Sequence, residues 1–355
     1  MLSAILAVAA PTSVLADDGA ASIAAGGLVS RRETRIVMAK EVLKISTKKI
    51  VVDYDFRNDS DQDVTTEVAF PIPPYENGVV EGPGQAAQAF ESFKLWIDDN
   101  PAQYESEAAA TLNGKEVSVI LRANRIDIPT FGHFDAKEVV TPDFTRLPKA
   151  VREQLVQTGL FEPRDANWGK WTVHLQYHWT QTFPAHSTVH IRHEYTPVVG
   201  AADDTPIDAL QFLLNSGSAK RDAKRWRDSG ADEVAAFCPE PDLLRTVIRR
   251  VSEVKNDRSV YDGTIFPIQW VDFILTTANT WQRPIEDFTL IVERPEPDSS
   301  WRNLVSFCSP ENGKVEKLDA DHFQVHLTNF VPTSELHIGF FDVPGAKASQ
   351  PAGKK

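Results

Sequence analysis

The sequence is short of positive charge and of long apolar runs. It has 37 Lys and Arg residues against 50 Asp and Glu residues, a formal net charge of −13 at pH 7. Because Lys and Arg supply most of the affinity for a phosphate backbone, we expect no nucleic-acid partner. After the first sixteen residues, no stretch reaches the roughly 20 apolar residues that a membrane helix requires. We therefore expect no integral membrane segment once those residues are removed.

Motifs that carry well-known chemistries are also missing. The chain has no G-x-S-x-G turn, no H-E-x-x-H pair, no Walker loop and no G-x-G-x-x-G stretch after a strand pattern. Carboxylates are plentiful, but the sequence alone does not pair any two of them as acid and base. Catalytic residues are therefore unknown, and the missing motifs favour a protein without enzymatic activity.

Cysteine is scarce, with two residues in 355. Residues 1–16 are apolar, and the small residues Val14 and Ala16 stand where a signal peptidase requires them. We therefore expect residues 1–16 to be a signal peptide and the protein to be periplasmic or secreted. In an exported chain, an even cysteine count favours a disulfide bond between Cys238 and Cys308; two free buried thiols are the alternative.

Short stretches in which apolar and polar residues alternate recur along the chain. This alternation, together with many β-branched and aromatic residues, is typical of half-buried strands. It occurs at 35–45, 49–57, 64–72, 93–97, 116–121, 268–278, 288–293, 304–308, 323–327 and 336–341. We expect the first three to form an antiparallel meander. The predicted fold class is mainly β, with antiparallel β-sandwich-like units and a few covering helices.

Three segments have helical patterns. Residues 241–254 place their aliphatic side chains on one face and arginines opposite, with a proline suited to the first turn. Residues 205–208 have the form of a capping box that opens a second helix. Residues 147–159 end at a glycine suited to a left-handed cap. We expect these helices to cover sheet faces or to join two units.

The chain is also long for one domain, since roughly 100–200 residues per domain is usual. A boundary near residue 200 separates the strand-rich first part from the helical segments. The predicted division is an N-terminal β-rich domain at 17–200, a C-terminal β-rich domain with helices at 201–345 and a flexible tail at 346–355.

Five of the nine histidines fall within residues 171–200, where two strand patterns flank a turn. Residues four apart on one strand are about 13 Å apart, too far for His174 and His178 to hold one ion. If the two strands pair across the turn, His178 faces His190 and His174 faces Glu194, with Cβ atoms about 5 Å apart. A zinc site, and with it a metal-dependent periplasmic hydrolase, is then the alternative to a binding function. The competing interpretation is a hairpin whose histidines face solvent.

Asp59, Asp61 and Asp63 have the D-x-D-x-D spacing found in calcium loops. An EF-hand needs Gly at its sixth position and Glu at its twelfth, where this chain has Val64 and Phe70. A hairpin turn is the favoured interpretation, and weak calcium binding is the alternative. We otherwise expect no cofactor.

Several stretches of the sequence occur in the same order in a known family. They are Asp17-Asp18-Gly19-Ala20, Gly26-Gly27-Leu28, VAFPIP (68–73), WTQTFPA (179–185), Tyr195-x-Pro197-x-x-Gly200 and TTANTWQRPI (276–285). On these stretches the chain resembles the bacterial family known as domain of unknown function 4424. The resemblance implies an exported protein rich in β-structure and supplies no catalytic residue.

Aromatic residues stand beside two expected strand ends. Trp179 and Phe183 close one strand pattern, and Asn279 and Trp281 lie in a polar break between two others. Such residues can line a recognition surface, and packing between the two units is the alternative. We therefore expect an exported bacterial envelope protein that is a non-enzymatic binding or assembly module for an envelope protein or a glycan.

Overall fold

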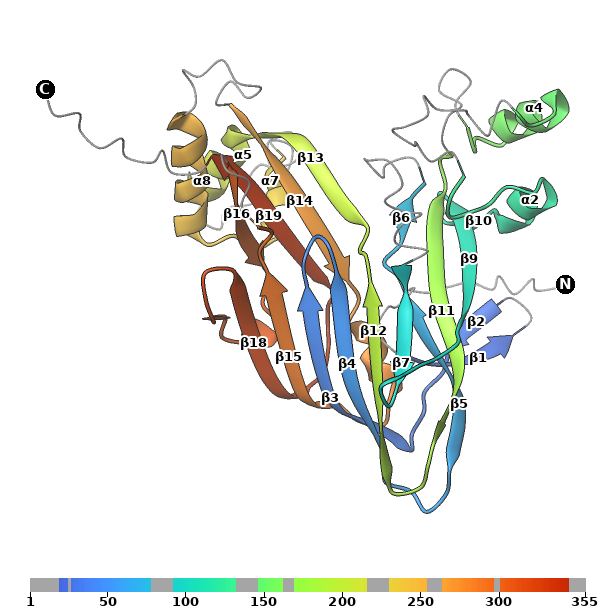
Figure 1. Cartoon of the computed structure of the whole chain (residues 1–355). Helices are drawn as coiled ribbons and strands as arrows, with labels where there is room; N and C mark the ends of the chain where they lie inside the picture. The colour runs from blue at the N-terminus through green and yellow to red at the C-terminus, as the bar shows by residue number, and fades with distance from the viewer. Residues whose placement is uncertain are drawn as a thin grey trace, which may run out of the picture.

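The chain folds mainly into β-strands, arranged in three sheets with helices outside them (Figure 1). The computed structural model describes residues 19–24, 27–77, 92–131, 146–161, 169–215, 230–253, 264–296 and 301–344, with the backbone alone for residues 19–30 and 301. The expected signal peptide, 1–16, and the expected tail, 346–355, lie outside these residues. Across the described ranges, no helix is both apolar enough and long enough to span a membrane.

The first sheet has the strand order β10-β9-β11-β5-β1-β2, with β6 also paired to β11. All its neighbours are antiparallel. Its strands are β1 (Gly19–Ala24), β2 (Gly27–Ser30), β5 (Val64–Pro71), β6 (Tyr75–Glu76), β9 (Glu105–Leu112), β10 (Lys115–Glu116) and β11 (Thr172–Phe183).

The second sheet has the order β17-β18-β15-β3-β4-β12-β7-β8. Its neighbours are antiparallel except for β3 and β15, which are parallel. Its strands are β3 (Ile36–Ile45), β4 (Ile50–Asn58), β7 (Lys94–Ile97), β8 (Asn100–Pro101), β12 (Ser187–Tyr195), β15 (Ile285–Glu293), β17 (Glu316–Lys317) and β18 (His322–Phe330).

The third sheet has the order β13-β14-β19-β16 and carries the C-terminal helices. Its strands are β13 (Val199–Pro206), β14 (Ile265–Phe273), β16 (Trp301–Phe307) and β19 (Leu336–Pro344). The helices are α2 (Ser118–Ala123), α4 (Lys149–Gln157), α5 (Ile207–Asn215), α7 (Ala231–Ala235) and α8 (Pro241–Glu253), with 3₁₀ turns η1 (Thr276–Thr280) and η2 (Pro310–Asn312).

One hydrophobic core joins side chains of all three sheets. In Figure 1 the first and second sheets face each other and meet at the end where β4 runs into β5 and β11 runs into β12. The core between them is rich in aromatic rings, and Tyr54, Phe70, Tyr177, Trp281 and Phe288 are each at most 1% exposed. Burial alternates along β4, which is the pattern that the sequence predicts for a half-buried strand.

The second sheet spans the predicted boundary near residue 200, whereas the first sheet lies before it and the third begins at Val199. Strand β15 pairs in parallel with β3, from Asp287 beside Lys40 to Val292 beside Ile45. The second sheet therefore takes strands from both sides of residue 200, and the main core does the same. The chain order of the strands is a poor guide here because pairing joins segments that are about 250 residues apart.

Two local expectations are wrong. The sequence predicts a strand at 116–121, but Ser118–Ala123 form helix α2, which buries Leu121 and leaves Val119 75% exposed. Tertiary packing of one turn thus overrides the β propensity of this stretch. The meander also stops after two strands, because β5 pairs with β11 and β1 and not with β4.

The predicted helices and the disulfide bond are present. Helix α8 buries Leu244, Val247 and Val251 on its inner face, and Gly159 has the left-handed φ of +77° expected after α4. Cys238 and Cys308 are joined by a disulfide bond and lie 70 positions apart in the sequence. By the loop-entropy account, a cross-link over this separation stabilises the fold by roughly 4 kcal/mol. It ties the segment after α7 to the end of β16.

Candidate functional site

The histidine-rich stretch does not form a paired hairpin. Strand β11 pairs with β5 and β9 in the first sheet, and β12 pairs with β4 and β7 in the second sheet. The turn between them is present, with His186 at a positive φ of 51°, but it carries the chain from one sheet to the other. The predicted register of His178 opposite His190 is therefore wrong.

The two histidines have separate acidic partners. Nδ1 of His178 lies 2.7 Å from a carboxylate oxygen of Glu67, across the neighbouring strand of the first sheet. Nδ1 of His190 lies 3.0 Å from Asp55, its direct neighbour on β4, and Nε2 lies 3.6 Å from Asp53. Each histidine thus has its own acidic partner on a neighbouring strand, and the two histidines lie in different sheets.

The other expected ligands are also apart. Nε2 of His174 lies 2.9 Å from the hydroxyl of Thr111, and burial lowers the pKa of this histidine. Glu194 lies in the second sheet between Lys49 (3.0 Å) and Lys94 (3.5 Å), and Lys49 lowers its pKa. Nowhere in the described ranges do three or more His, Cys, Asp or Glu side chains gather as a metal would need.

The three aspartates between β4 and β5 also point to different partners. Asp59 accepts from Arg57 and Arg283 at 2.7 and 2.8 Å. Asp61 pairs with His186 at 2.8 Å. Asp63 accepts from the backbone N–H of Ala185 at 2.8 Å. Asp61 and Asp63 thus tie the β4–β5 turn to the β11–β12 turn, and Asp59 ties it to Arg283 in the segment before β15. A structural role accounts for all three carboxylates.

Three of the four residues expected to line a recognition surface lie inside the core. Trp179, Phe183 and Trp281 are 5%, 0% and 1% exposed, and the rings of Phe183 and Trp281 are 6.1 Å apart. The surface interpretation is wrong for these rings, and packing between the sheets describes them. Asn279 is exposed, and its amide donates to the carbonyl of Pro332 at 2.8 Å.

A different group of aromatic residues lines a small cavity where the three sheets meet, which we name the junction pocket. Its volume is about 150 Å³. A dry cavity of about this size accommodates a single six-membered ring. Its lining residues are Ile72, Pro73, Pro74, Tyr75, Glu76, Tyr195, Pro197, Val198, Val199, Gly200, Trp270 and Asp272.

The pocket exists because strand β12 ends at Tyr195 and the chain crosses to the third sheet before β13 begins at Val199. Two prolines precede Tyr75 on the opposite wall, where β6 pairs with β11 through Tyr75 beside Val173. Proline has no backbone N–H to donate to a neighbouring strand. Pro73 and Pro74 therefore interrupt the strand pairing on this side of the pocket.

Gly200 determines where the indole of Trp270 lies in the pocket lining. It lies beside Trp270 in the β13–β14 ladder, and a Cβ atom built at Gly200 would approach Cε2 of Trp270 to 2.1 Å. Only a residue without a side chain lets the indole lie against the backbone there. The indole is half-buried and forms part of the pocket lining.

The charged residues that line the pocket are acidic. Glu76 is exposed, and Asp272 is partly exposed with Oδ1 at 2.8 Å from Nδ1 of His337, its cross-strand neighbour. The hydrogen bond to Asp272 raises the pKa of His337. Tyr75 donates from its hydroxyl to the carbonyl of Pro129 at 3.3 Å, and burial raises its pKa. Two carboxylates and three aromatic rings thus surround one small cavity.

The sequence does not predict this pocket as a site, although two of the family-like stretches contribute to its lining. VAFPIP supplies Ile72 and Pro73, and the stretch from Tyr195 to Gly200 supplies most of the opposite wall. The sequence gives no reason to assign a binding role to Trp270 or Asp272, because both fit the alternating pattern of an ordinary strand. Only the pairing of β13 with β14 brings them to the same place.

Comparison with known proteins gives a family but no activity. The model of a family described as a domain of unknown function, DUF4424, matches residues 16–338, and the chain therefore belongs to this family. Among curated proteins, none matches the chain. A crystal structure of a candidate nutrient binding protein from Legionella pneumophila resembles it with 15% identity and a TM-score of 0.39, over 87% of this chain and 68% of that one.

Proposed function

We propose that this protein is an exported, non-enzymatic binding module of the bacterial envelope that recognises one sugar ring of a glycan in the junction pocket. The observation that carries the proposal is the convergence of Tyr75, Tyr195 and Trp270 with Glu76 and Asp272 on a cavity of about 150 Å³. Pockets at the meeting of structural units, mostly apolar with a few polar groups, are typical ligand sites.

The lining suits a sugar because it combines two kinds of contact. Aromatic faces pack against the C–H surface of a pyranose ring, and carboxylate oxygens accept hydrogen bonds from its hydroxyl groups. A carboxylate is acceptor-only when ionised, so Glu76 and Asp272 select a ligand that is rich in donors. The net charge of −13 further disfavours strongly anionic ligands.

Isothermal titration calorimetry with glucose and N-acetylglucosamine oligomers tests the proposal directly. We expect the native protein to bind at least one of the two series and the Trp270→Ala variant to lose this binding. Trp96→Ala is the matched control, because Trp96 lies on β7, outside the pocket, beneath the guanidinium of Arg192.

Two results would contradict the proposal. If the native protein binds neither series of oligomers, the proposal of a glycan ligand is wrong. Hydrolysis of general esterase, glycosidase or phosphatase substrates by the purified protein would remove the non-enzymatic one. Export is tested separately by the mass of the protein recovered from the periplasm, which we expect to begin at Asp17.

A further inference from the structure

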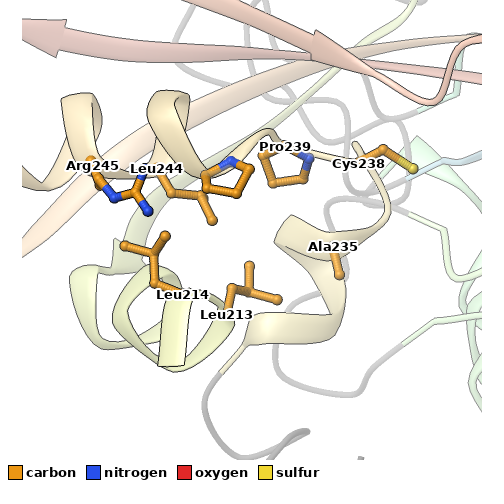
Figure 2. A pocket seen from close by; sticks show the side chains of 8 residues that line it. Leu213, Leu214, Ala235, Cys238, Pro239, Leu244 and Arg245 are labelled. Atoms are coloured by element: carbon orange, nitrogen blue, oxygen red, sulfur yellow. The ribbon is translucent and has the colours of Figure 1, made fainter. Parts of the chain in front are cut away.

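A second cavity lies between helices α5, α7 and α8, and none of its lining residues belongs to the junction pocket. Its volume is about 400 Å³, within the range of roughly 300–1,000 Å³ that small-molecule pockets occupy. Figure 2 shows Leu213 and Leu214 on α5 pointing across the open space toward Pro239 and Leu244. We name this cavity the helical groove.

The walls of the groove are apolar side chains that are not fully covered. Leu213 and Leu214 are half-buried at the end of α5, and Pro239 is half-buried in the segment that leads into α8. Exposed apolar area of this kind gains free energy when a hydrocarbon chain covers it. The groove is therefore suited to a flexible apolar ligand more than to a rigid polar one.

One cation stands at an end of the groove. Figure 2 places Arg245 at one end of the lining and Cys238 at the other. Among the described residues that line it, Arg245 is the charged one, and its side chain is 64% exposed. Nη1 donates to Asp242 at 2.6 Å. A guanidinium carries five N–H donors, so this contact occupies one of them.

The surroundings add positive charge on the same helix. Arg249 and Arg250 follow Arg245 on α8, and Arg250 lies 3.9 Å from Glu253. Asp242 and Glu240 are the acidic residues at the start of the helix. Helix α8 thus has three arginines against two acidic residues in a chain whose net charge is −13, and the exposed Arg245 beside the apolar groove suits an anionic group.

We propose that the helical groove binds an amphiphile with one acyl chain and an anionic headgroup, with the chain between the leucines of α5 and Pro239 and the headgroup on Arg245. Dodecanoate is the probe, below its critical micelle concentration, with native mass spectrometry for stoichiometry and calorimetry for affinity. We expect one molecule per protein, and an affinity that rises about three- to fourfold for each CH₂ added from octanoate to dodecanoate.

Matched variants separate the headgroup from the chain. Arg245→Gln should lower the affinity for dodecanoate about tenfold, because a charge-assisted hydrogen bond is lost. It should leave the weaker binding of dodecyl maltoside unchanged. Arg249→Gln, one turn along the same helix, is the control and should bind dodecanoate within twofold of the native protein.

The apolar walls have their own pair of variants. Leu214→Asp should abolish binding of both amphiphiles, whereas Leu318→Asp, at a residue that is 51% exposed elsewhere on the surface, should not. If Leu214→Asp does not fold by circular dichroism, Ala235→Leu narrows the groove with an apolar side chain and should weaken binding of both amphiphiles.

Three results would overturn this proposal. The first is no binding of dodecanoate to the native protein. The second is an equal loss for Arg245→Gln and Arg249→Gln. The third is sedimentation with phosphatidylglycerol vesicles without binding of monomeric dodecanoate, which would indicate a membrane-surface contact. None of these bears on saccharide binding at the junction pocket, which the Trp270→Ala variant tests.

Discussion

Strand β12 supplies one residue to each of two aromatic-rich regions, His193 to a closed one and Tyr195 to an open one. On one side, the ring of His193 is fully buried among aromatic rings at centroid distances of 4.8–5.6 Å, which we name the buried cage. Its rings are Tyr54, Phe70, Phe93 and Trp179. On the other side, Tyr195 lines the junction pocket. Aromatic content alone therefore does not distinguish a core from a binding site.

The difference lies in what covers each region. The buried cage is closed because inward side chains of β5 and β11 in the first sheet pack against those of β4 and β12 in the second sheet. The junction pocket stays open because the chain leaves the second sheet at Tyr195 and enters the third at Val199. A cavity persists where neither sheet supplies side chains to fill it.

The largest expected effect separates the two regions by stability. Trp281→Ala should lower the free energy of unfolding by about 3–5 kcal/mol, because a fully buried indole leaves a cavity between the sheets. Trp270→Ala should cost only about 1–2 kcal/mol, since its indole is only partly buried. Urea unfolding measures both. Equal losses of unfolding free energy in the two variants would show that Trp270 is a core residue, and would contradict the distinction between the two regions.

The buried cage should also make the fold sensitive to acid. Burial lowers the pKa of His193 to about 3, against about 6.5 in an unfolded chain. Between these values the unfolded state binds a proton and the folded state does not. Stability from this residue is thus present above pH 6.5 and falls by about 1.4 kcal/mol per pH unit as pH decreases toward 3.

The variant His193→Gln should remove this component. Urea unfolding at pH 7 and pH 5 should show a loss of about 2 kcal/mol for the native protein from this group, and a smaller loss for the variant. His326→Gln is the control, because His326 is half exposed and lies 3.0 Å from Asp287. The same acid sensitivity in His193→Gln and in the native protein would show that His193 is not its source.

A substitution in the junction pocket should weaken saccharide binding and have little effect on the free energy of unfolding. Asp272→Asn removes a charged acceptor and should weaken saccharide binding about tenfold, with under about 1 kcal/mol lost in unfolding. Asp287→Asn is the matched control, since it alters a similar Asp–His pair outside the pocket. An equal effect of the two variants on binding would contradict a direct role for Asp272.

The smallest effect concerns His337. Its pKa is raised by the hydrogen bond to Asp272, so its small stabilising contribution is complete below about pH 6.5 and is lost as pH rises through the folded pKa. An NMR titration of the His337 ring should give a pKa above 6.5 in the native protein and a lower one in Asp272→Asn. An unchanged pKa in the variant would place the cause elsewhere.

Much of the local structure could be predicted from the sequence. The strands β3, β4, β15 and β18, the inner face of α8 and the cysteine pair all follow from alternation, helical period and cysteine count. Residues 116–121 could not, because the packing of Leu121 outweighs their strand propensity. The helical groove was missed because Leu213, Leu214 and Arg245 read as ordinary residues of amphipathic helices.

The sequence by itself determined the mainly β fold class, the negative charge, the disulfide bond and membership of a family. These depend on composition, on local alternation, on the cysteine count and on the order of short stretches, all of which the sequence specifies directly. The tertiary structure alone decided that the turn before His186 joins two sheets, that Trp179 and Trp281 are core residues, and that Trp270 and Asp272 meet Tyr75. Those outcomes depend on strand pairing between distant segments, and the alternating pattern of a strand is the same whichever partner it takes.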